Sequence, residues 1–421
     1  MIKKIFPVLL VSISILYSQE FEKKLNNNFI NSPVFFEQNY INSAQSSILF
    51  LSYKIPYNLL NFIKEQNRYF ADVSVNVELK DKDDFIYREA MIDNCFVEEY
   101  NLTQSRKNYL EGVIKFNLPI GQYKVFANLV LNNSKNLVIP QITDLQIEED
   151  KFPFIRPIFA YRNNNKDSVD SFRMTNFGNN IPFIHQDLTL IIPIKDLLQD
   201  NISIEIIQNN EICFIKNITN PIPFKFNIEK MYDEIYLNNH NGEEIFLFFI
   251  DGFNKNLSEG DVQIKVICNS EEQIFNSKVI WFDKPRSLHF PEFAIEVLAA
   301  IESEEKISNL FKGGEEKYYS SLIDYWKEMK PNDGYAFNEI MKEYYLRVDY
   351  ALDNFSSFKL RNGHETDRGI IYIKYGRPDE IERDYSKRND INEIWTYTKL
   401  NKQFLFVDQT GTGDYKLTSQ K

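Results

Sequence analysis

The chain has 421 residues, of which 43% are hydrophobic and 26% charged, and its formal net charge is -12. This length and apolar content suffice for two or three domains with their own cores, and the 35 Phe and 24 Tyr residues exclude a disordered chain. The acidic balance excludes a typical nucleic-acid-binding protein, because neutralising phosphates requires clustered Lys and Arg.

The first 18 residues have the pattern of a secretory signal peptide. Lys3 and Lys4 precede an apolar run from Ile5 to Tyr17, and the small residue Ser18 follows it. As a helix this run spans roughly 20 Å, short of the ~30 Å hydrocarbon core of a membrane, so it predicts export rather than a permanent transmembrane anchor. Leu16 departs from the small-residue rule for cleavage, which leaves the cleavage site open.

The signal predicts an extracytoplasmic protein, whether periplasmic, associated with an outer membrane or secreted. Loss of residues 1–18 removes two lysines, so the formal charge would move from -12 to -14.

The chain has three cysteines, Cys95, Cys213 and Cys268, and an odd number cannot all form disulfides within one chain. Cys213 and Cys268 fall in one predicted domain, where they are either a disulfide or two separately buried thiols.

Strict alternation of apolar and polar residues predicts strands in the first two thirds of the chain. The pattern is present in residues 72–79 and 122–131, and it returns in residues 201–207 and 261–268. Turn residues rather than long helical patterns separate these runs, which favours antiparallel sandwiches over βαβ units. The faces expected to be buried in the first two runs are Val73, Val75, Val77 and Leu79, and Tyr123, Val125, Ala127, Leu129 and Leu131.

A short internal repeat indicates that there are two such sandwiches. "LPIGQYKV" begins at Leu118 and "LSEGDVQI" at Leu257, and each places a glycine before an alternating run, as a turn that leads into a strand does. Charge and proline near Asp150 and Pro285 mark the boundaries. We therefore predict a multidomain chain with two all-β immunoglobulin-like sandwiches, residues 19–150 and 151–285, and an α+β domain over residues 286–421.

The last third begins with helical spacing and ends with strand patterns. Helices are expected within residues 293–311, 315–330 and 336–355, and Asn332 and Asp333 are candidate N-caps for the third helix. Strands are expected in residues 369–376, 393–400, 403–410 and 414–417, which gives helices followed by an antiparallel sheet. The third helix should bury one face formed by Phe337, Ile340, Tyr344, Val348, Leu352 and Phe355.

Five blocks in this region occur in a specific order: "YW" at Tyr325, "NEIMKEYYLRV" at Asn338, "GHETDRGIIYIKYGRPD" at Gly363, "EIWTY" at Glu393 and "FLFVD" at Phe404. Together they resemble the bacterial GWxTD domain family over roughly residues 290–418. The resemblance implies an exported protein in which a signal peptide and a β-rich region precede the domain, and it implies no enzymatic activity.

The family signature is matched closely but not completely. Residues that agree with it are Gly363, Thr366, Asp367, Arg368 and Gly369. His364 stands where the family has tryptophan, so any role that requires that indole does not carry over to this chain.

The segment from Gly363 to Glu380 has two interpretations. In the first it is a structural clasp: Thr366 and Asp367 accept backbone hydrogen bonds in a turn, Arg368 contacts a carboxylate such as Glu365 or Glu393, and Gly376 and Pro378 form a second turn. In the second it is a polar cleft where Glu365, Asp367 and Arg368 meet a ligand. The clasp is preferred, with a strand over residues 370–375 that pairs with residues 393–398 and places Trp395 in a sheet covered by the long helix.

Other chemistry has little support in the sequence. Adjacent residues of a strand point to opposite faces, so His364, Glu365 and Asp367 are not expected to share a metal ion. The loop that starts at Asp408 resembles a calcium loop, but Ser419 stands where a bidentate Glu is needed. No HExxH, GxSxG, CxxC or phosphate-binding glycine motif is present, so no catalytic residue, metal or cofactor is assigned. The chain has four histidines, so a Ser-His-Asp site stays an alternative, but no local signature supports one.

These observations leave two functions of different classes. The first is a non-enzymatic protein of the cell envelope whose C-terminal domain binds an envelope protein or a glycan. The second is a carboxylate-dependent hydrolase or glycan-active enzyme in the same domain, which would need Glu365 or Asp367 in a pocket with a second carboxylate roughly 5 to 10 Å away.

Overall fold

The computed structural model describes residues 34–42, 46–131, 135–139, 144–147, 154–162, 170–195, 201–268, 271–330, 332–357, 362–384 and 391–421. The predicted signal peptide and the predicted boundary near residue 150 lie outside these residues. The chain forms two compact units: a β unit, Asn31–Asp283 with Gly334–Phe337, and a C-terminal unit that contains Lys284–Asp333 and Asn338–Lys421. No helix in the described ranges is long and apolar enough to cross a membrane.

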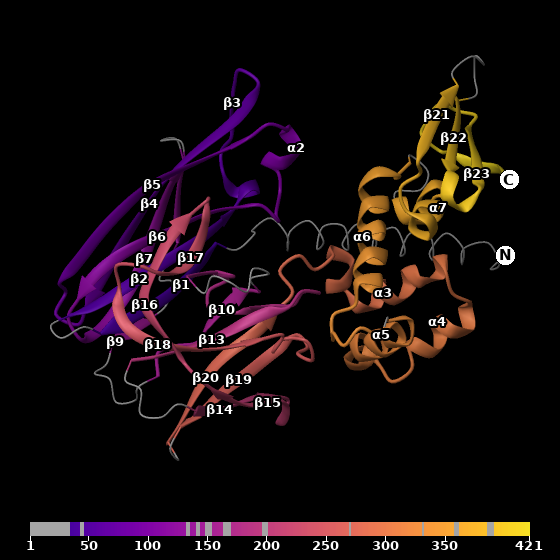
Figure 1. The fold of residues 1–421 in the computed structure, drawn as a ribbon. Coiled ribbons are helices and arrows are strands. Elements are labelled where there is room, and N and C mark those ends of the chain that lie inside the picture. Colours follow the sequence, from indigo (N-terminus) through magenta and orange to yellow (C-terminus); the bar gives the residue numbers. More distant parts are fainter. Residues whose placement is uncertain are drawn as a thin grey trace, which may run out of the picture. The chain divides into compact units, whose positions relative to one another are not determined.

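The first half of the β unit contains two sheets, here called A and B (Figure 1). Sheet A is antiparallel in the order β1-β2-β6, and the long strand β4 of sheet B pairs with β5 and with β7. Their strands are β1 (Phe35–Asn42), β2 (Ser47–Pro56) and β6 (Tyr109–Leu118) in sheet A, and β3 (Ile63–Glu65), β4 (Arg68–Asp81), β5 (Ile86–Val97), β7 (Gly121–Leu131), β8 (Lys135–Ile139) and β9 (Asp144–Ile147) in sheet B. Two short helical turns, η1 (Tyr57–Leu59) and α2 (Tyr100–Thr103), lie in the connections.

The second half contains sheets C and D. Sheet C has the order β10-β13-β18-β16-β17-β11 and sheet D the order β12-β20-β19-β14-β15, in which the β12–β20 pair is parallel and the other pairs are antiparallel. Sheet C consists of β10 (Ile158–Tyr161), β11 (Ser171–Arg173), β13 (Leu188–Ile194), β16 (Ile222–Met231), β17 (Glu234–Asn239) and β18 (Glu243–Asp251). Sheet D consists of β12 (Ile181–Pro182), β14 (Asn201–Gln208), β15 (Glu211–Thr219), β19 (Gly260–Cys268) and β20 (Glu271–Ile280).

Three apolar clusters show that the four sheets pack in the order B, A, C, D. Sheets B and A share one cluster, sheets A and C a second, and sheets C and D a third. Sheet A is therefore covered on both faces, which explains why nine of the ten residues of β2 are buried. The alternation read in the sequence is confirmed, because the predicted inward residues of β4 and β7 are all at most 3% exposed.

The repeat glycines both lie at the start of a strand, Gly121 at β7 and Gly260 at β19. Of the two, only Gly260 has a positive φ, +132°, so the steric argument for glycine holds at that position alone. The three cysteines are free thiols in the structure, so Cys213 and Cys268 are not bonded to each other.

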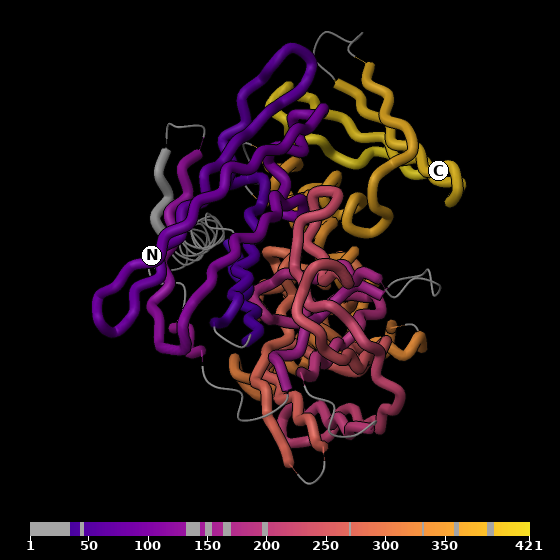
Figure 2. The backbone as a smooth tube through the Cα atoms, turned by 60° about the vertical axis from the view of Figure 1, so that its left-hand side comes forward, coloured from indigo at the N-terminus to yellow at the C-terminus, as the bar shows by residue number. Residues whose placement is uncertain are grey.

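The C-terminal unit consists of helices followed by an antiparallel sheet, as predicted. The sheet, called E, has the order β21-β22-β23-β24 and is drawn from orange to yellow in Figure 2. Its strands are β21 (Glu380–Asp384), β22 (Ile391–Tyr397), β23 (Lys402–Asp408) and β24 (Lys416–Gln420). The helices are η2 (Arg286–His289), α3 (Pro291–Glu296), η3 (Val297–Ala300), α4 (Glu304–Leu310), α5 (Glu315–Met329), α6 (Glu339–Asn354), η4 (Gly363–Glu365), α7 (Asp367–Tyr375) and η5 (Thr398–Leu400).

Two predictions about α6 were wrong. Its N-cap is Asn338, whose side chain accepts hydrogen bonds from the backbone N–H groups of Ile340 and Met341, rather than Asn332 or Asp333. Tyr344 and Val348 are buried as predicted, but Ile340 is 43% exposed, because the buried face also includes Met341 and Tyr345. Phe337 precedes the helix and belongs to the β unit, where its ring contacts Phe183 and Trp281.

The predicted strand over residues 370–375 was also wrong: this segment is the helix α7. Its Tyr372 and Tyr375 rings pack on Trp395 of β22 and Phe404 of β23. The sheet does contain Trp395, paired with Phe404, and α7 packs on it, while Phe355, which directly follows α6, also contacts the Trp395 ring. β22 pairs with β21 and β23 rather than with residues 370–375.

Candidate functional site

The signature segment forms a tight turn that leads directly into α7. Gly363, His364 and Glu365 make one 3-10 turn, and Thr366 is the N-cap of the helix. The Thr366 hydroxyl accepts a hydrogen bond from the Gly369 N–H at 3.0 Å and donates one to the Gly363 carbonyl at 2.8 Å. This is the ordinary function of threonine at a helix N-terminus, where backbone N–H groups otherwise lack partners.

Two glycines of the signature are required by close backbone packing. A Cβ atom on Gly363 would lie 2.0 Å from the carbonyl oxygen of Ala351 in α6, and one on Gly369 would lie 1.9 Å from the Gly363 carbonyl oxygen. Neither backbone atom can move aside as a flexible side chain can. Gly363 and Gly369 therefore permit the turn, α6 and α7 to approach one another.

The end of α7 is shaped by the second turn. Gly376 has φ +78° and ends the helix, and the buried Pro378 follows it. The Tyr397 hydroxyl donates a 2.8 Å hydrogen bond to the Gly376 carbonyl, which ties this turn to β22. Gly376 and Pro378 thus connect helix to sheet.

Glu393 is the buried polar centre of this region. Its carboxylate is 1% exposed and accepts hydrogen bonds from the Arg383 Nε at 2.7 Å and the Trp395 Nε1 at 2.7 Å, with the Arg368 Nη1 at 3.5 Å. Arg368 also lies over the Tyr415 ring, 4.0 Å from its centroid. Of the two carboxylates considered for Arg368, the structure brings Glu393 to it.

The two remaining acidic residues of the motif are not gathered around a ligand space. Asp367 accepts a hydrogen bond from the backbone N–H of Leu417 at 2.6 Å, which joins the start of α7 to β24. The Glu365 side chain is half exposed and accepts a hydrogen bond from Asn362 in its own turn. Thr366, Asp367 and Arg368 each have a structural contact, so the site as observed holds the turn, α7 and sheet E together.

His364 is packed as an aromatic residue. Its ring contacts Phe293 edge to face, with ring centroids 5.1 Å apart, and its side chain is 14% exposed. Burial lowers the pKa of His364 below its ordinary value, with Glu365 acting in the opposite direction. Within the described ranges Nδ1 is buried without a hydrogen-bond partner, and the ring packs here as an aromatic group.

The candidate calcium loop is a hairpin connection closed by its own first residue. The Asp408 carboxylate accepts hydrogen bonds from the N–H groups of Thr410, Gly411 and Gly413. Burial would raise the pKa of Asp408, but these hydrogen bonds outweigh it and the net shift is downward. Across the described residues, no group of three or more His, Cys, Asp or Glu side chains is placed to hold a metal ion.

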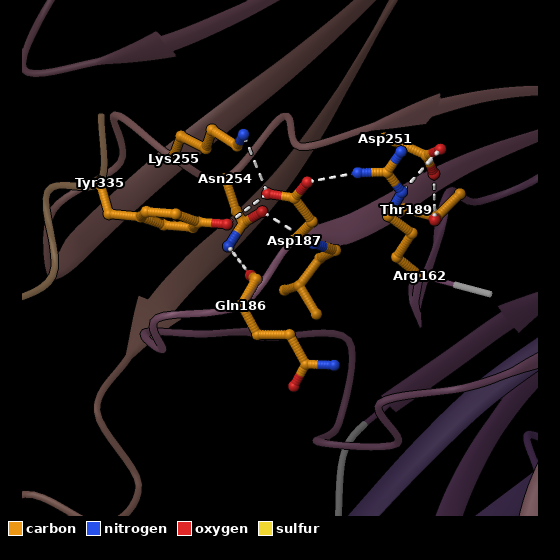
Figure 3. Close-up of polar contacts among 9 residues, drawn as sticks. Arg162, Gln186, Asp187, Thr189, Asp251, Asn254, Lys255 and Tyr335 are labelled. Atoms are coloured by element: carbon orange, nitrogen blue, oxygen red, sulfur yellow. Dashed lines mark hydrogen bonds and ion pairs between the residues drawn. The ribbon is translucent and has the colours of Figure 1, made fainter. Parts of the chain in front are cut away.

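A second polar cluster lies in the β unit and was not identified from the sequence (Figure 3). Asp187 accepts hydrogen bonds from the Tyr335 hydroxyl at 2.5 Å and from Arg162 at 2.7 Å, and it pairs with Lys255 at 3.1 Å. Burial would raise the pKa of Asp187, but these hydrogen bonds outweigh it and lower the pKa. The Ala336 N–H also donates to the Lys255 carbonyl.

This cluster fixes the segment Gly334–Phe337 within the β unit. Asn254 supports it, because its amide bonds the Gln186 carbonyl and the Leu188 N–H, as Figure 3 shows. Every charge drawn has a partner, so the cluster holds no free base or nucleophile. Nothing in the sequence pattern links residue 335 to residue 187, because they are 148 positions apart.

Comparison with known proteins agrees with the C-terminal geometry. The family model of the GWxTD domain matches residues 274–421. No curated protein matches the chain. The turn that begins at Gly363, the helix that Thr366 caps and the sheet that holds Trp395 all lie inside the matched range, and the C-terminal part of this chain is a GWxTD domain.

Proposed function

We propose that the protein is an exported protein of the cell envelope that acts by binding, in which the GWxTD domain docks a partner protein and immunoglobulin-like sandwiches in the β unit support it. The observation that carries this proposal is that the signature residues make contacts within their own domain. Thr366, Asp367 and Arg368 are each engaged by groups of their own domain, which supports a scaffold function for these three residues.

The edge strand β21 offers the docking surface that the structure favours. Among the described strands it pairs with β22 alone, and all five of its residues are exposed. An edge strand presents unpaired backbone N–H and C=O groups that a partner strand can join. Ile381, which is 49% exposed, supplies an apolar contact, and Glu380, Glu382 and Asp384 alternate with it.

Export is proposed from the sequence pattern of residues 1–18, in which two lysines precede a short apolar run. The immunoglobulin-like assignment is supported by antiparallel sheets that share apolar cores, with strands of about the length that such domains use.

The hydrolase alternative is not proposed. It needs Glu365 or Asp367 in a pocket beside a second carboxylate, whereas Asp367 accepts the Leu417 N–H and Glu365 lies half exposed in a turn.

Affinity purification of the tagged full chain from envelope extracts tests the proposal. We expect a specific partner to co-elute with the wild type and to be lost with Ile381→Lys in β21. Ile340→Lys is the matched control, because Ile340 is 43% exposed on α6 and lies away from the sheet edge. A chain that elutes alone from every extract, or a partner that both variants retain equally, would contradict docking at β21.

A further inference from the structure

A groove of about 440 Å³ lies in the β unit between its two halves. Strands β2 and β6 contribute one wall, and β10, β11 and the β16–β17 turn contribute to the other. Its size is within the roughly 300 to 1,000 Å³ typical of small-molecule sites. Because the groove is built from residues of the β unit, a ligand can bind there whether or not a partner docks at β21.

Six of the sixteen residues that line the groove are aromatic. Tyr57, Tyr109, Tyr161, Tyr232, Phe177 and Phe282 all line the groove. Among the described residues, the hydroxyls of Tyr109 and Tyr161 have no hydrogen-bond partner, although both rings are partly buried. Burial raises the pKa of Tyr161 to about 12, so its phenol is a hydrogen-bond donor at every physiological pH.

Most of the charges along the groove are paired. The buried Lys54 pairs with Glu111 at 3.0 Å, Arg173 pairs with Glu234, and Lys107 lies 3.7 Å from Asp283. The fourth acidic residue of the lining, Asp233, lies 3.6 Å from Lys230. The lining therefore holds three cations and four carboxylates, and the one negative charge in excess disfavours an anionic ligand. Two of the cations also cover ring faces, Lys54 on Phe177 and Arg173 on Tyr161, which disfavours a cationic ligand there.

The placement of Tyr232 is the most unusual feature of the groove. Tyr232 and Asp233 form the two-residue turn between β16 and β17, with φ +51° and +66°. Such turns favour Asn and Gly, and the corresponding turn between β14 and β15 is Asn209–Asn210. A bulky residue in this conformation is strained. Tyr232 is the only aromatic residue with positive φ in the described ranges, and it stands 87% exposed at the rim of the groove.

We infer that this groove binds a neutral saccharide. Sugars combine apolar C–H faces, which pack on aromatic rings, with hydroxyls that both donate and accept hydrogen bonds. The groove supplies the matching elements: exposed ring surface at Tyr232, free phenol hydroxyls at Tyr109 and Tyr161, and charged side chains, most of them paired, that accept and donate hydrogen bonds. The strained turn holds the Tyr232 ring at the rim for contact with the ligand.

Binding of neutral trisaccharides to the full chain tests the inference, with maltotriose, cellotriose, mannotriose and chitotriose as probes in calorimetry and ligand-observed NMR. We expect at least one probe to bind. Tyr232→Asn should weaken that binding roughly tenfold, the effect of losing one aromatic contact, while raising the thermal midpoint because Asn suits the turn. Tyr161→Phe should weaken binding without loss of stability.

Tyr100→Ala is the matched control, since Tyr100 is 64% exposed in the β unit but does not line the groove. It should leave saccharide binding unchanged. The inference is overturned if no probe binds at millimolar concentration, if Tyr232→Asn and Tyr100→Ala have equal effects on binding, or if only peptides or charged saccharides bind in a manner that depends on Tyr232.

Discussion

Trp395 donates its indole N–H to the Glu393 carboxylate, two residues earlier on the same strand, at 2.7 Å, and both side chains are 1% exposed. Alternation along β22 places both on the face of sheet E on which α7 packs. A carboxylate buried beside an apolar core is costly unless donors surround it. Arg368 and Arg383 supply those donors. Arg368 of the "GHETDRG" block is therefore needed as a partner for Glu393 of the "EIWTY" block.

Arg368→Ala should lower the free energy of unfolding of the C-terminal unit by about 1 to 3 kcal/mol, because Glu393 would remain buried with one donor fewer. Arg368 is 11% exposed and its guanidinium also packs on the Tyr415 ring. Calorimetry of the full chain measures the shift in the thermal midpoint.

Arg383→Ala is the matched control for burial. Arg383 makes the shorter contact to Glu393, 2.7 Å against 3.5 Å, but its side chain is 51% exposed and therefore screened by water. We expect its removal to cost less than about 1 kcal/mol. If Arg383→Ala destabilises the domain more than Arg368→Ala, the contribution of each arginine to stability follows its distance from Glu393 rather than its burial. The clasp interpretation of Arg368 would then fail.

Gly363→Ala and Gly369→Ala should each destabilise the domain by about 1 to 3 kcal/mol or more, because the added Cβ would overlap a backbone carbonyl at 2.0 or 1.9 Å. Gly121→Ala, at a strand start where the Cβ meets only ordinary contacts from 3.5 Å outward, is the comparison. Chemical denaturation gives the three values. Near-equal costs at all three positions would mean that the turn relaxes, and that the signature glycines are not fixed by packing.

His364 predicts a specific dependence of stability on pH. Burial lowers its pKa below the ordinary value of 6.5, so the folded state favours the neutral ring and the unfolded chain takes up the proton first. Stability should therefore be full above pH 6.5 and decrease as pH falls below it. His364→Phe keeps an aromatic ring against Phe293 and should remove this part of the acid dependence, measured as thermal midpoints at several pH values. Identical pH profiles for the variant and the wild type would show that His364 does not titrate on unfolding.

The sequence predicted the sheets of the β unit well because a half-buried strand must alternate. Val73, Val75 and Val77 could only share one face, and all three are buried in the structure. The burial of β2 on both faces could not be read in the same way. Its Ser52 and Lys54 look solvent-facing in sequence, but the segment that follows β11 covers them: Ser52 bonds the Asn176 side chain and Lys54 the Thr175 carbonyl. Lys54 also pairs with Glu111 of the neighbouring strand β6.

The prediction for residues 370–375 failed because residue preference was weighed above the helix signals on either side. Ile370, Ile371 and Ile373 favour a strand, but Thr366 caps a helix and Gly376 ends one. The Gly363 and Gly369 contacts with neighbouring backbone then hold the helical arrangement, which is a tertiary effect. The acceptor for Arg368 could be named from sequence as one of two carboxylates, whereas the Asp187 cluster depends on long-range packing that no local pattern encodes.

Tyr335→Phe should loosen the segment Gly334–Phe337 while leaving the β unit folded. The Tyr335 hydroxyl donates to the ionised Asp187, and losing this hydrogen bond should cost about 1 kcal/mol, because the cluster is partly exposed. The pKa of Asp187 is lowered below its ordinary value of 3.8, so this contribution is present above pH 3.8 and is lost as pH falls below it.

Amide hydrogen exchange at Ala336, whose N–H is bonded to the Lys255 carbonyl, should accelerate in the Tyr335→Phe variant at neutral pH. Tyr350→Phe, which removes the hydroxyl of a 44% exposed tyrosine, is the control and should leave exchange at Ala336 unchanged. Unchanged exchange at Ala336 in Tyr335→Phe would mean that Phe337, packed on Phe183 and Trp281, holds the segment without help from the polar cluster.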